Sequence, residues 1–176
     1  MKNKINVGII GYGVVGKKRA LSIKKCKYLN LIAISDINSK NNPKKDKIKF
    51  YNSYLELINS KNIKAIFICL PTKDAAIATK LSIKSGLDIF CEKPPATNLK
   101  ELLEIKKLLN NYKNLKLVYG FNHRYHESVI EAQKIIKSKK YGKIINFRGV
   151  YGKSTIVGFD GGWRSSKSES GGGILI

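Results

Sequence analysis

Short, strongly apolar runs alternate with longer helix-forming segments through the first 120 residues. The unbroken apolar run at 65–70 is typical of a strand that is buried on both faces of a parallel sheet. Strands that alternate with helices in this way predict a doubly wound α/β fold. The predicted strands lie at 5–10, 28–35, 48–51, 65–70, 87–91 and 115–120, and the predicted helices at 14–25, from Ser53, between Thr72 and Gly86, and from Thr97 or Asn98 to about Asn111.

The pattern changes after residue 120. A helical segment is predicted at 127–138, an alternating segment at 143–151 predicts a strand, and residues 154–173 are rich in Gly and Ser. We therefore expect a complete first domain at 1–120. Residues 121–176 are expected to begin a second α/β domain that is too short to close a core of its own.

A glycine-rich loop follows the first predicted strand directly. Gly11, Gly13 and Gly16 form a G-x-G-x-x-G pattern that opens the helix at 14–25. In such a loop the first glycine permits the tight turn, the second lets a pyrophosphate approach the backbone, and the third lets the helix pack closely on the strand. The N-terminus of the helix then offers free N–H groups to the phosphates. The pattern predicts a dinucleotide site.

An acidic residue stands at the expected distance from this loop. Asp36 ends the second predicted strand, where a carboxylate accepts hydrogen bonds from the adenosine ribose hydroxyls and repels a 2′-phosphate. NAD is therefore favoured over NADP. The alternative is a glycine turn without a ligand and an Asp36 that merely caps the following loop.

Other chemistry-bearing residues follow the fourth and fifth predicted strands. In an open parallel sheet, ligands bind outside the carboxyl ends of the strands, so residues that follow different strands converge there. Thr72 is also expected to N-cap the helix that it precedes. The candidate cofactor-binding residues are Gly11, Tyr12, Gly13, Val14, Val15, Gly16, Asp36, Leu70, Pro71, Thr72, Glu92 and Lys93.

The charge of the chain changes this interpretation little. A formal net charge of +22 is typical of nucleic-acid binders, but here the excess is almost all lysine and is spread along the chain. We expect no nucleic-acid partner, and no apolar run reaches the ~20 residues of a membrane span. The three cysteines form no C-x-x-C pair, so we expect free thiols, a cytoplasmic location and no metal site.

Four motifs in order give the chain a family resemblance. The glycine loop, Glu92-Lys93-Pro94, the stretch 120–124 and Gly162-Trp163-Arg164 resemble the family of glucose-fructose oxidoreductase, inositol 2-dehydrogenase and MocA. The resemblance implies a Rossmann domain followed by an α/β domain for substrate and oligomer contacts. It also implies transfer of a hydride to or from a carbon of a sugar, cyclitol or nucleotide-sugar, and a homo-oligomeric parent protein.

By this resemblance Lys93 is the catalytic lysine. Its ammonium would polarise the reacting oxygen and also contact substrate and cofactor. The other candidate substrate-binding residues are Asn122, Arg124, Trp163 and Arg164. Both arginines suit a carboxylate or phosphate on the substrate, but they suit a role at the domain junction equally well.

The last residues depart from the family pattern. In the family, the stretch seen here at 171–176 is followed by Asp-x-x-x-His, which supplies the catalytic histidine, and this sequence ends one residue before that Asp. We therefore expect a fragment of a longer enzyme with little or no turnover alone, which alcohol-dependent NAD reduction by the 176-residue protein would contradict. The alternative function is a non-catalytic NAD(H)-binding module.

Overall fold

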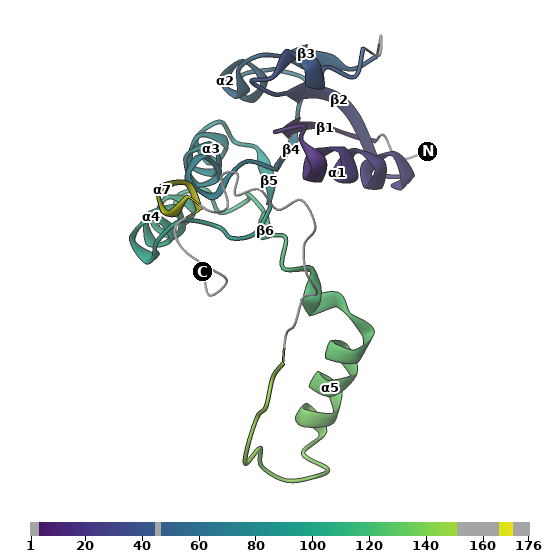
Figure 1. The fold of residues 1–176 in the computed structure, drawn as a ribbon, viewed down its shortest axis with the longest axis vertical. Helices are drawn as coiled ribbons and strands as arrows, with labels where there is room; N and C mark the ends of the chain where they lie inside the picture. Colours follow the sequence, from purple (N-terminus) through teal and green to yellow (C-terminus); the bar gives the residue numbers. More distant parts are fainter. Residues whose placement is uncertain (1–3, 45–46, 151–165, 171–176) are drawn as a thin grey trace. The chain divides into compact units, whose positions relative to one another are not determined.

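The computed structural model describes residues 4–44, 47–150 and 166–170. Six parallel strands form one sheet in the order β3-β2-β1-β4-β5-β6 (Figure 1). The strand order reverses between β1 and β4, as in a doubly wound α/β fold. The strands are β1 Ile5–Ile10, β2 Leu29–Ser35, β3 Lys49–Tyr51, β4 Ala65–Ile68, β5 Asp88–Cys91 and β6 Leu117–Tyr119.

Helices cover both faces of this sheet (Figure 1). Helix α1 packs on one face through Ile23, which joins an apolar cluster with Val7, Ile9 and Ile34. Helices α2, α3 and α4 pack on the other face, where the larger cluster lies. The helices of this part are α1 Val14–Lys25, η1 Ser39–Asn41, α2 Tyr54–Ile58, α3 Thr72–Lys84, α4 Leu99–Leu109 and the short α7 Lys167–Ser170. The predicted α/β fold is confirmed.

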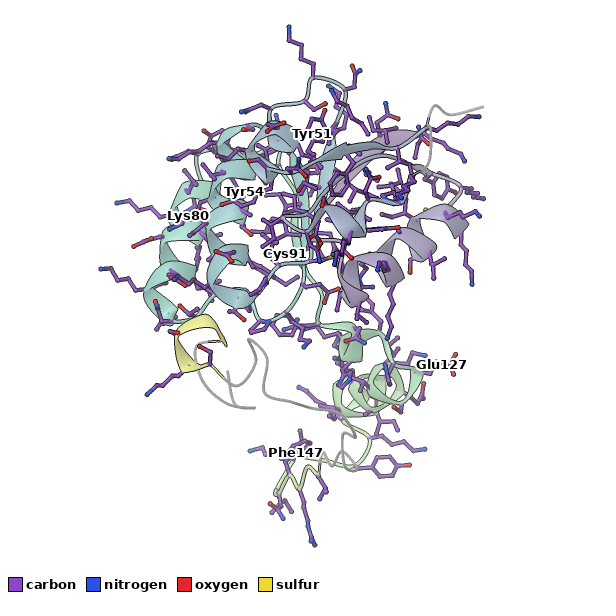
Figure 2. All side chains as sticks on the ribbon, turned by 45° about the horizontal axis from the view of Figure 1, so that its top comes forward. Tyr51, Tyr54, Lys80, Cys91, Glu127 and Phe147 are labelled. Carbon is purple, nitrogen blue, oxygen red and sulfur yellow. The ribbon has the colours of Figure 1, made fainter. Side chains whose placement is uncertain are left out.

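The core is built from the apolar runs that predict the strands. Cys91 lies in the interior of this part, at the end of β5, whereas Lys80 of α3 reaches the surface (Figure 2). Lys80 Nζ there pairs with Glu104 Oε2 of α4 at 3.0 Å. The buried face of α3 thus carries small and apolar residues, with Thr79 and Ser82 bonded to the backbone of the helix itself, and its outer face is charged.

Strand β1 matches its apolar run, whereas β4 and β6 are shorter than theirs. The run at 65–70 continues beyond β4, which ends at Ile68, because Pro71 has no N–H for a ladder and the chain turns into α3. The run at 115–120 likewise exceeds β6, because the N–H of Leu115 bonds to the carbonyl of Tyr112 in a turn.

The structure divides into two compact units. The described part of the first is residues 4–44, 47–120 and 166–170, and that of the second is residues 121–150. The second unit contains η2 Asn122–Tyr125 and α5 Glu127–Ser138, and the predicted helix at 127–138 is confirmed. Within the described ranges, no helix is both long enough and apolar enough to cross a membrane.

The strand predicted at 143–151 is wrong over its described part. Residues 143–150 form no ladder, and their apolar side chains stand in solvent, with Ile145 98% and Phe147 86% exposed (Figure 2). A strand requires a neighbour for its N–H and C=O groups, and the described part of this unit provides none. Residue 151 lies outside the described residues.

Candidate functional site

The carboxyl ends of the parallel strands bring the candidate residues to one edge of the sheet. β1 lies between β2 and β4, and β4 lies beside β5. The glycine loop, Asp36, the 70–72 segment and Glu92-Lys93 follow these four strands. The edge includes the point where the strand order reverses, which is where ligands bind in this class of fold.

Two glycines of the loop are required by its packing. Gly11 has φ +83°, and a Cβ there would lie 2.6 Å from the carbonyl oxygen of Cys69. A Cβ on Gly16 would lie 2.0 Å from the carbonyl oxygen of Gly11. No side chain fits at either position, because the obstructing atoms belong to the backbone.

The middle glycine differs from the other two. A Cβ on Gly13 would meet nothing within 4 Å, and its φ of −69° suits any residue. Glycine is therefore not required there by the fold itself. It leaves open space at the N-terminus of α1, whose first turn carries no acidic side chain. Free N–H groups beside open space form a site for an anion such as a phosphate.

Asp36 is tied to the glycine loop. Its Oδ2 accepts a hydrogen bond from the N–H of Tyr12 at 2.6 Å, and its Oδ1 accepts one from the N–H of Asn38 at 2.8 Å. The hydrogen bond from Asn38 confirms that Asp36 caps the following loop, but the bond from Tyr12 shows that this is not its only contact. The carboxylate caps that loop and also holds the glycine loop, and each of its oxygens keeps a free lone pair for a ligand hydroxyl.

The N-terminus of α3 contradicts one prediction. Pro71 is the N-cap residue, and Thr72 is the first helical residue rather than the cap. Proline fixes its own φ near the observed −54°, so the chain enters the helix one residue earlier. Thr72 is only 2% exposed, and its Oγ1 has no hydrogen-bond partner among the described residues. A buried hydroxyl without a partner is costly, so this position is a source of local instability in the described part of the chain.

Glu92 has a partner that the sequence patterns do not reveal. Arg19 of α1 donates from Nε to Oε1 of Glu92 at 2.6 Å, and Arg19 Nη2 contacts the same oxygen. The two residues are 73 positions apart, and no local spacing rule connects them. The one sequence feature that could have suggested this ion pair is the position of Arg19, three residues after the last glycine of the loop.

Two thiols lie near this pair, that of the half-buried Cys69 and that of the buried Cys91. Burial, with the charge of Glu92 adding to it, raises the pKa of Cys69 to about 12. Burial likewise raises the pKa of Cys91 to about 11. Both thiols therefore stay protonated at neutral pH, and neither is a nucleophile. Among the described residues, no three His, Cys, Asp or Glu side chains gather to hold a metal ion.

The other candidate residues differ in how far the structure describes them. Lys93 is exposed just beyond β5, and the Lys93–Pro94 peptide bond is cis. Asn122 and Arg124 lie in the 3-10 turn of the second unit, where the Arg124 guanidinium stands 5.8 Å from the centre of the Phe121 ring. Trp163 and Arg164 lie outside the described residues.

The sequence of this chain is similar to those of bacterial oxidoreductases. It is 32% identical over 146 residues to the uncharacterised oxidoreductase YrbE of Bacillus subtilis, which covers 81% of the chain and 42% of that protein. It is 26% identical over 145 residues to a myo-inositol 2-dehydrogenase of Thermotoga maritima, over 79% of the chain and 42% of the enzyme. The chain thus spans less than half the length of these curated relatives.

Solved structures agree in fold. The structure of myo-inositol 2-dehydrogenase from Lactobacillus plantarum matches with a TM-score of 0.74 and 31% identity, over 81% of this chain and 44% of that one. A scyllo-inositol dehydrogenase from Lactobacillus casei, solved with NAD(H) and scyllo-inositol, matches with a TM-score of 0.74 and 24% identity, over 80% and 43%. At that identity the second match supports the fold alone.

The family model described as "Oxidoreductase family, NAD-binding Rossmann fold" matches residues 5–121, the span that carries the glycine loop, Asp36 and Glu92-Lys93. The chain belongs to this oxidoreductase family.

Proposed function

We propose that this chain is the cofactor-binding part of a nicotinamide-dependent oxidoreductase that acts on a carbon bearing a hydroxyl group in a sugar or cyclitol. The names of relatives support this substrate class, because they include myo-inositol 2-dehydrogenase and levoglucosan dehydrogenase. The boundary after Gly120 supports a second proposal, that residues from 121 onward begin a domain for substrate and subunit contacts.

The state of the glycine loop is the observation that carries this proposal. Gly11 and Gly16 are packed against backbone, whereas Gly13 faces open space beside the N-terminus of α1. A turn without a ligand would need the two packed glycines but not the third. The open position, with Asp36 bound to the adjacent Tyr12, fits a diphosphate that is joined to a ribose.

Each residue at this edge has a role in the proposal. Gly13 and the first N–H groups of α1 hold the diphosphate, and Asp36 accepts from the ribose, while Leu70, Pro71 and Thr72 line the same edge. A bound nicotinamide accepts or supplies the hydride. Lys93 holds its ammonium group at the substrate oxygen and stabilises the negative charge that develops there. Asn122, Arg124, Trp163 and Arg164 are proposed to contact the substrate.

Asp36 also supports a preference for NAD over NADP. Its carboxylate faces the adenosine ribose in the proposed pose, where a 2′-phosphate would bring a second negative charge against it. Neither hydrogen bond to Asp36 comes from a cationic side chain, so its charge is not neutralised by them.

Titration of NADH and NADPH into the chain and its Asp36→Ala variant tests the proposal. We expect the variant to bind NADH at least about tenfold more weakly, which corresponds to losing roughly 1.4 kcal/mol. The affinity for NADPH should fall less than that for NADH, because the variant no longer sets a carboxylate against the 2′-phosphate, so the preference for NADH over NADPH should narrow. Glu56→Ala is the control, because Glu56 is an exposed acid on α2.

Absence of NADH binding by the unaltered chain would refute the cofactor assignment. The reduction of NAD with myo-inositol or levoglucosan is assayed on this chain and on a longer protein that contains it. If the chain binds NADH but neither protein reduces NAD, the non-catalytic binding module is favoured over the enzyme.

A further inference from the structure

An ion pair joins the helix of the glycine loop to the strand end that carries Lys93. Arg19 Nε donates to Glu92 Oε1 at 2.6 Å, with a second contact from Nη2 to the same oxygen. The side chain of Glu92 is 13% exposed and that of Arg19 is 29% exposed. A pair that is so largely removed from water acts with less screening than a surface pair.

The surroundings of the pair limit where its members can lie. The Arg19 guanidinium stands 4.9 Å from the centre of the Phe90 ring, and Phe90 packs against Phe67 at 5.3 Å between ring centres. The second carboxylate oxygen of Glu92, Oε2, occupies the space beside Gly120, where a Cβ would come within 2.9 Å of it. One oxygen is thus held by Arg19 and the other lies against the end of β6.

We propose that Arg19 and Glu92 are positioning residues that fix Lys93 relative to the diphosphate loop. This inference rests on the proposed function. Arg19 lies three residues after Gly16 on the helix whose N-terminus faces the loop, and Glu92 immediately precedes Lys93. In this inference Glu92 acts on the main chain beside Lys93, a role different from the cofactor contact for which it is a candidate. Its carboxylate sets the path of the main chain that delivers Lys93.

A positioning role has a distinct signature in binding. The diphosphate and adenosine are held by the loop and Asp36, whereas the nicotinamide half reaches toward Lys93. Loss of the Arg19–Glu92 ion pair should leave the binding of the adenosine and diphosphate unchanged and weaken the binding of the nicotinamide. NADH and ADP-ribose are suitable probes, because ADP-ribose keeps the adenosine, the diphosphate and the second ribose and lacks only the nicotinamide ring.

The experiment compares both ligands on four proteins by titration calorimetry: the unaltered chain, Arg19→Met, Glu92→Gln and the double variant. We expect the dissociation constant for NADH to rise about tenfold in each single variant and that for ADP-ribose to stay within about twofold. The double variant should be no weaker than the worse single variant, because both changes remove one interaction.

Three further variants separate positioning from charge and from folding. Lys18→Met removes a charge from an exposed position of the same helix and should change neither constant. Arg19→Lys keeps the charge but loses the planar fork, so it should restore only part of the NADH affinity. Gly120→Ala keeps both charges and displaces the carboxylate, so it should weaken NADH selectively even if Arg19→Met does not fold.

The outcomes distinguish this inference from the proposed function. Equal weakening of NADH and ADP-ribose, or unchanged NADH affinity in folded variants, overturns the inference and leaves the proposed function standing. An unaltered chain that binds neither ligand overturns both.

Discussion

The glycines of the loop belong to one motif, but the fold requires glycine at some of these positions and not at others. Gly16 is required by the fold, since its Cβ would lie 2.0 Å from the Gly11 carbonyl oxygen. Gly13 is not required by the fold, since its Cβ would meet nothing within 4 Å. A binding requirement and a folding requirement are thus separable at two positions of one loop.

Alanine substitutions at these two positions should therefore differ. We expect Gly16→Ala to lower the free energy of unfolding by about 3 kcal/mol or more, because backbone must move to accept the methyl group. Gly13→Ala should cost at most about 1 kcal/mol, from the change of N-cap residue, yet it should weaken NADH at least about tenfold because the methyl group fills the diphosphate space. Urea unfolding and NADH titration measure both quantities.

A Gly13→Ala variant that binds NADH normally would show that the open space is not the diphosphate site. A Gly16→Ala variant of unchanged stability would show that α1 can move away from the loop.

The sequence predicts which residues follow the strand ends at the candidate site, but it does not predict their hydrogen-bond and ion-pair partners. Asp36 stands out through its distance from the loop and its place after a strand. Its hydrogen bond to Tyr12 depends on how the loop curves over β2, and no sequence pattern encodes that curve. The Arg19–Glu92 pair joins side chains 73 residues apart, so it exists only after the sheet has formed.

At the scale of the element, helices were easier to predict than strand ends. The ranges 14–25 and 127–138 match α1 and α5, although neither helix has a side-chain cap at its N-terminus. Strand ends depend on the neighbouring strand, which explains why the apolar run at 65–70 exceeds β4. The strand expected at 143–151 failed for the same reason over its described part, since alternation does not supply a hydrogen-bonding partner.

Helix α4 offers a test of end signals. Asn98 Oδ1 accepts from the N–H of Glu101 at 3.0 Å, and Glu101 Oε2 accepts from both the N–H and the hydroxyl of Thr97 at 3.0 and 2.8 Å. We expect Asn98→Ala to lower the free energy of unfolding by about 1 kcal/mol through loss of the cap. Urea unfolding with Asn98→Asp as the matched replacement checks this, because aspartate keeps the acceptor. Equal losses in both variants would refute the capping role.

At the scale of the whole molecule, the order of the strands determines which residues meet. Alternation of strands and helices predicts a parallel sheet, and such a sheet gathers the carboxyl ends of β1, β2, β4 and β5 at one edge. The sequence therefore predicts the place of the site better than its contacts. The second unit lies beyond such an argument, because the apolar side chains of its described part are exposed.

Buried thiols should make the stability of the molecule fall at alkaline pH. The pKa of Cys69 is raised to about 12 and that of Cys91 to about 11, against a usual value of 9.0 in the unfolded chain. The neutral thiol is the form that the folded state favours, so this stabilisation is complete below pH 9 and is lost as the pH rises toward the folded values. Each thiol should contribute up to about 1.4 kcal/mol per pH unit in that window.

Urea unfolding at a series of pH values from 7.5 to 10.5 measures this loss. Because substitution itself alters packing, the slope against pH is compared rather than the absolute stability. A Cys69→Ala, Cys91→Ala double variant should show a shallower slope above pH 9 than the unaltered chain. Equal slopes of the free energy of unfolding against pH in the two proteins would assign the alkaline loss of stability to another group. Tyr119 is one such group, because burial also raises its pKa.

The hydrogen bond between Asp36 and Tyr12 has a consequence for the rate at which a ligand is captured. This bond holds the loop in its curved form without any ligand present, so the conformational entropy of the loop is lost during folding and not during binding. A dinucleotide should therefore meet a preorganised surface, and its association should follow a single fast phase without a slow loop rearrangement.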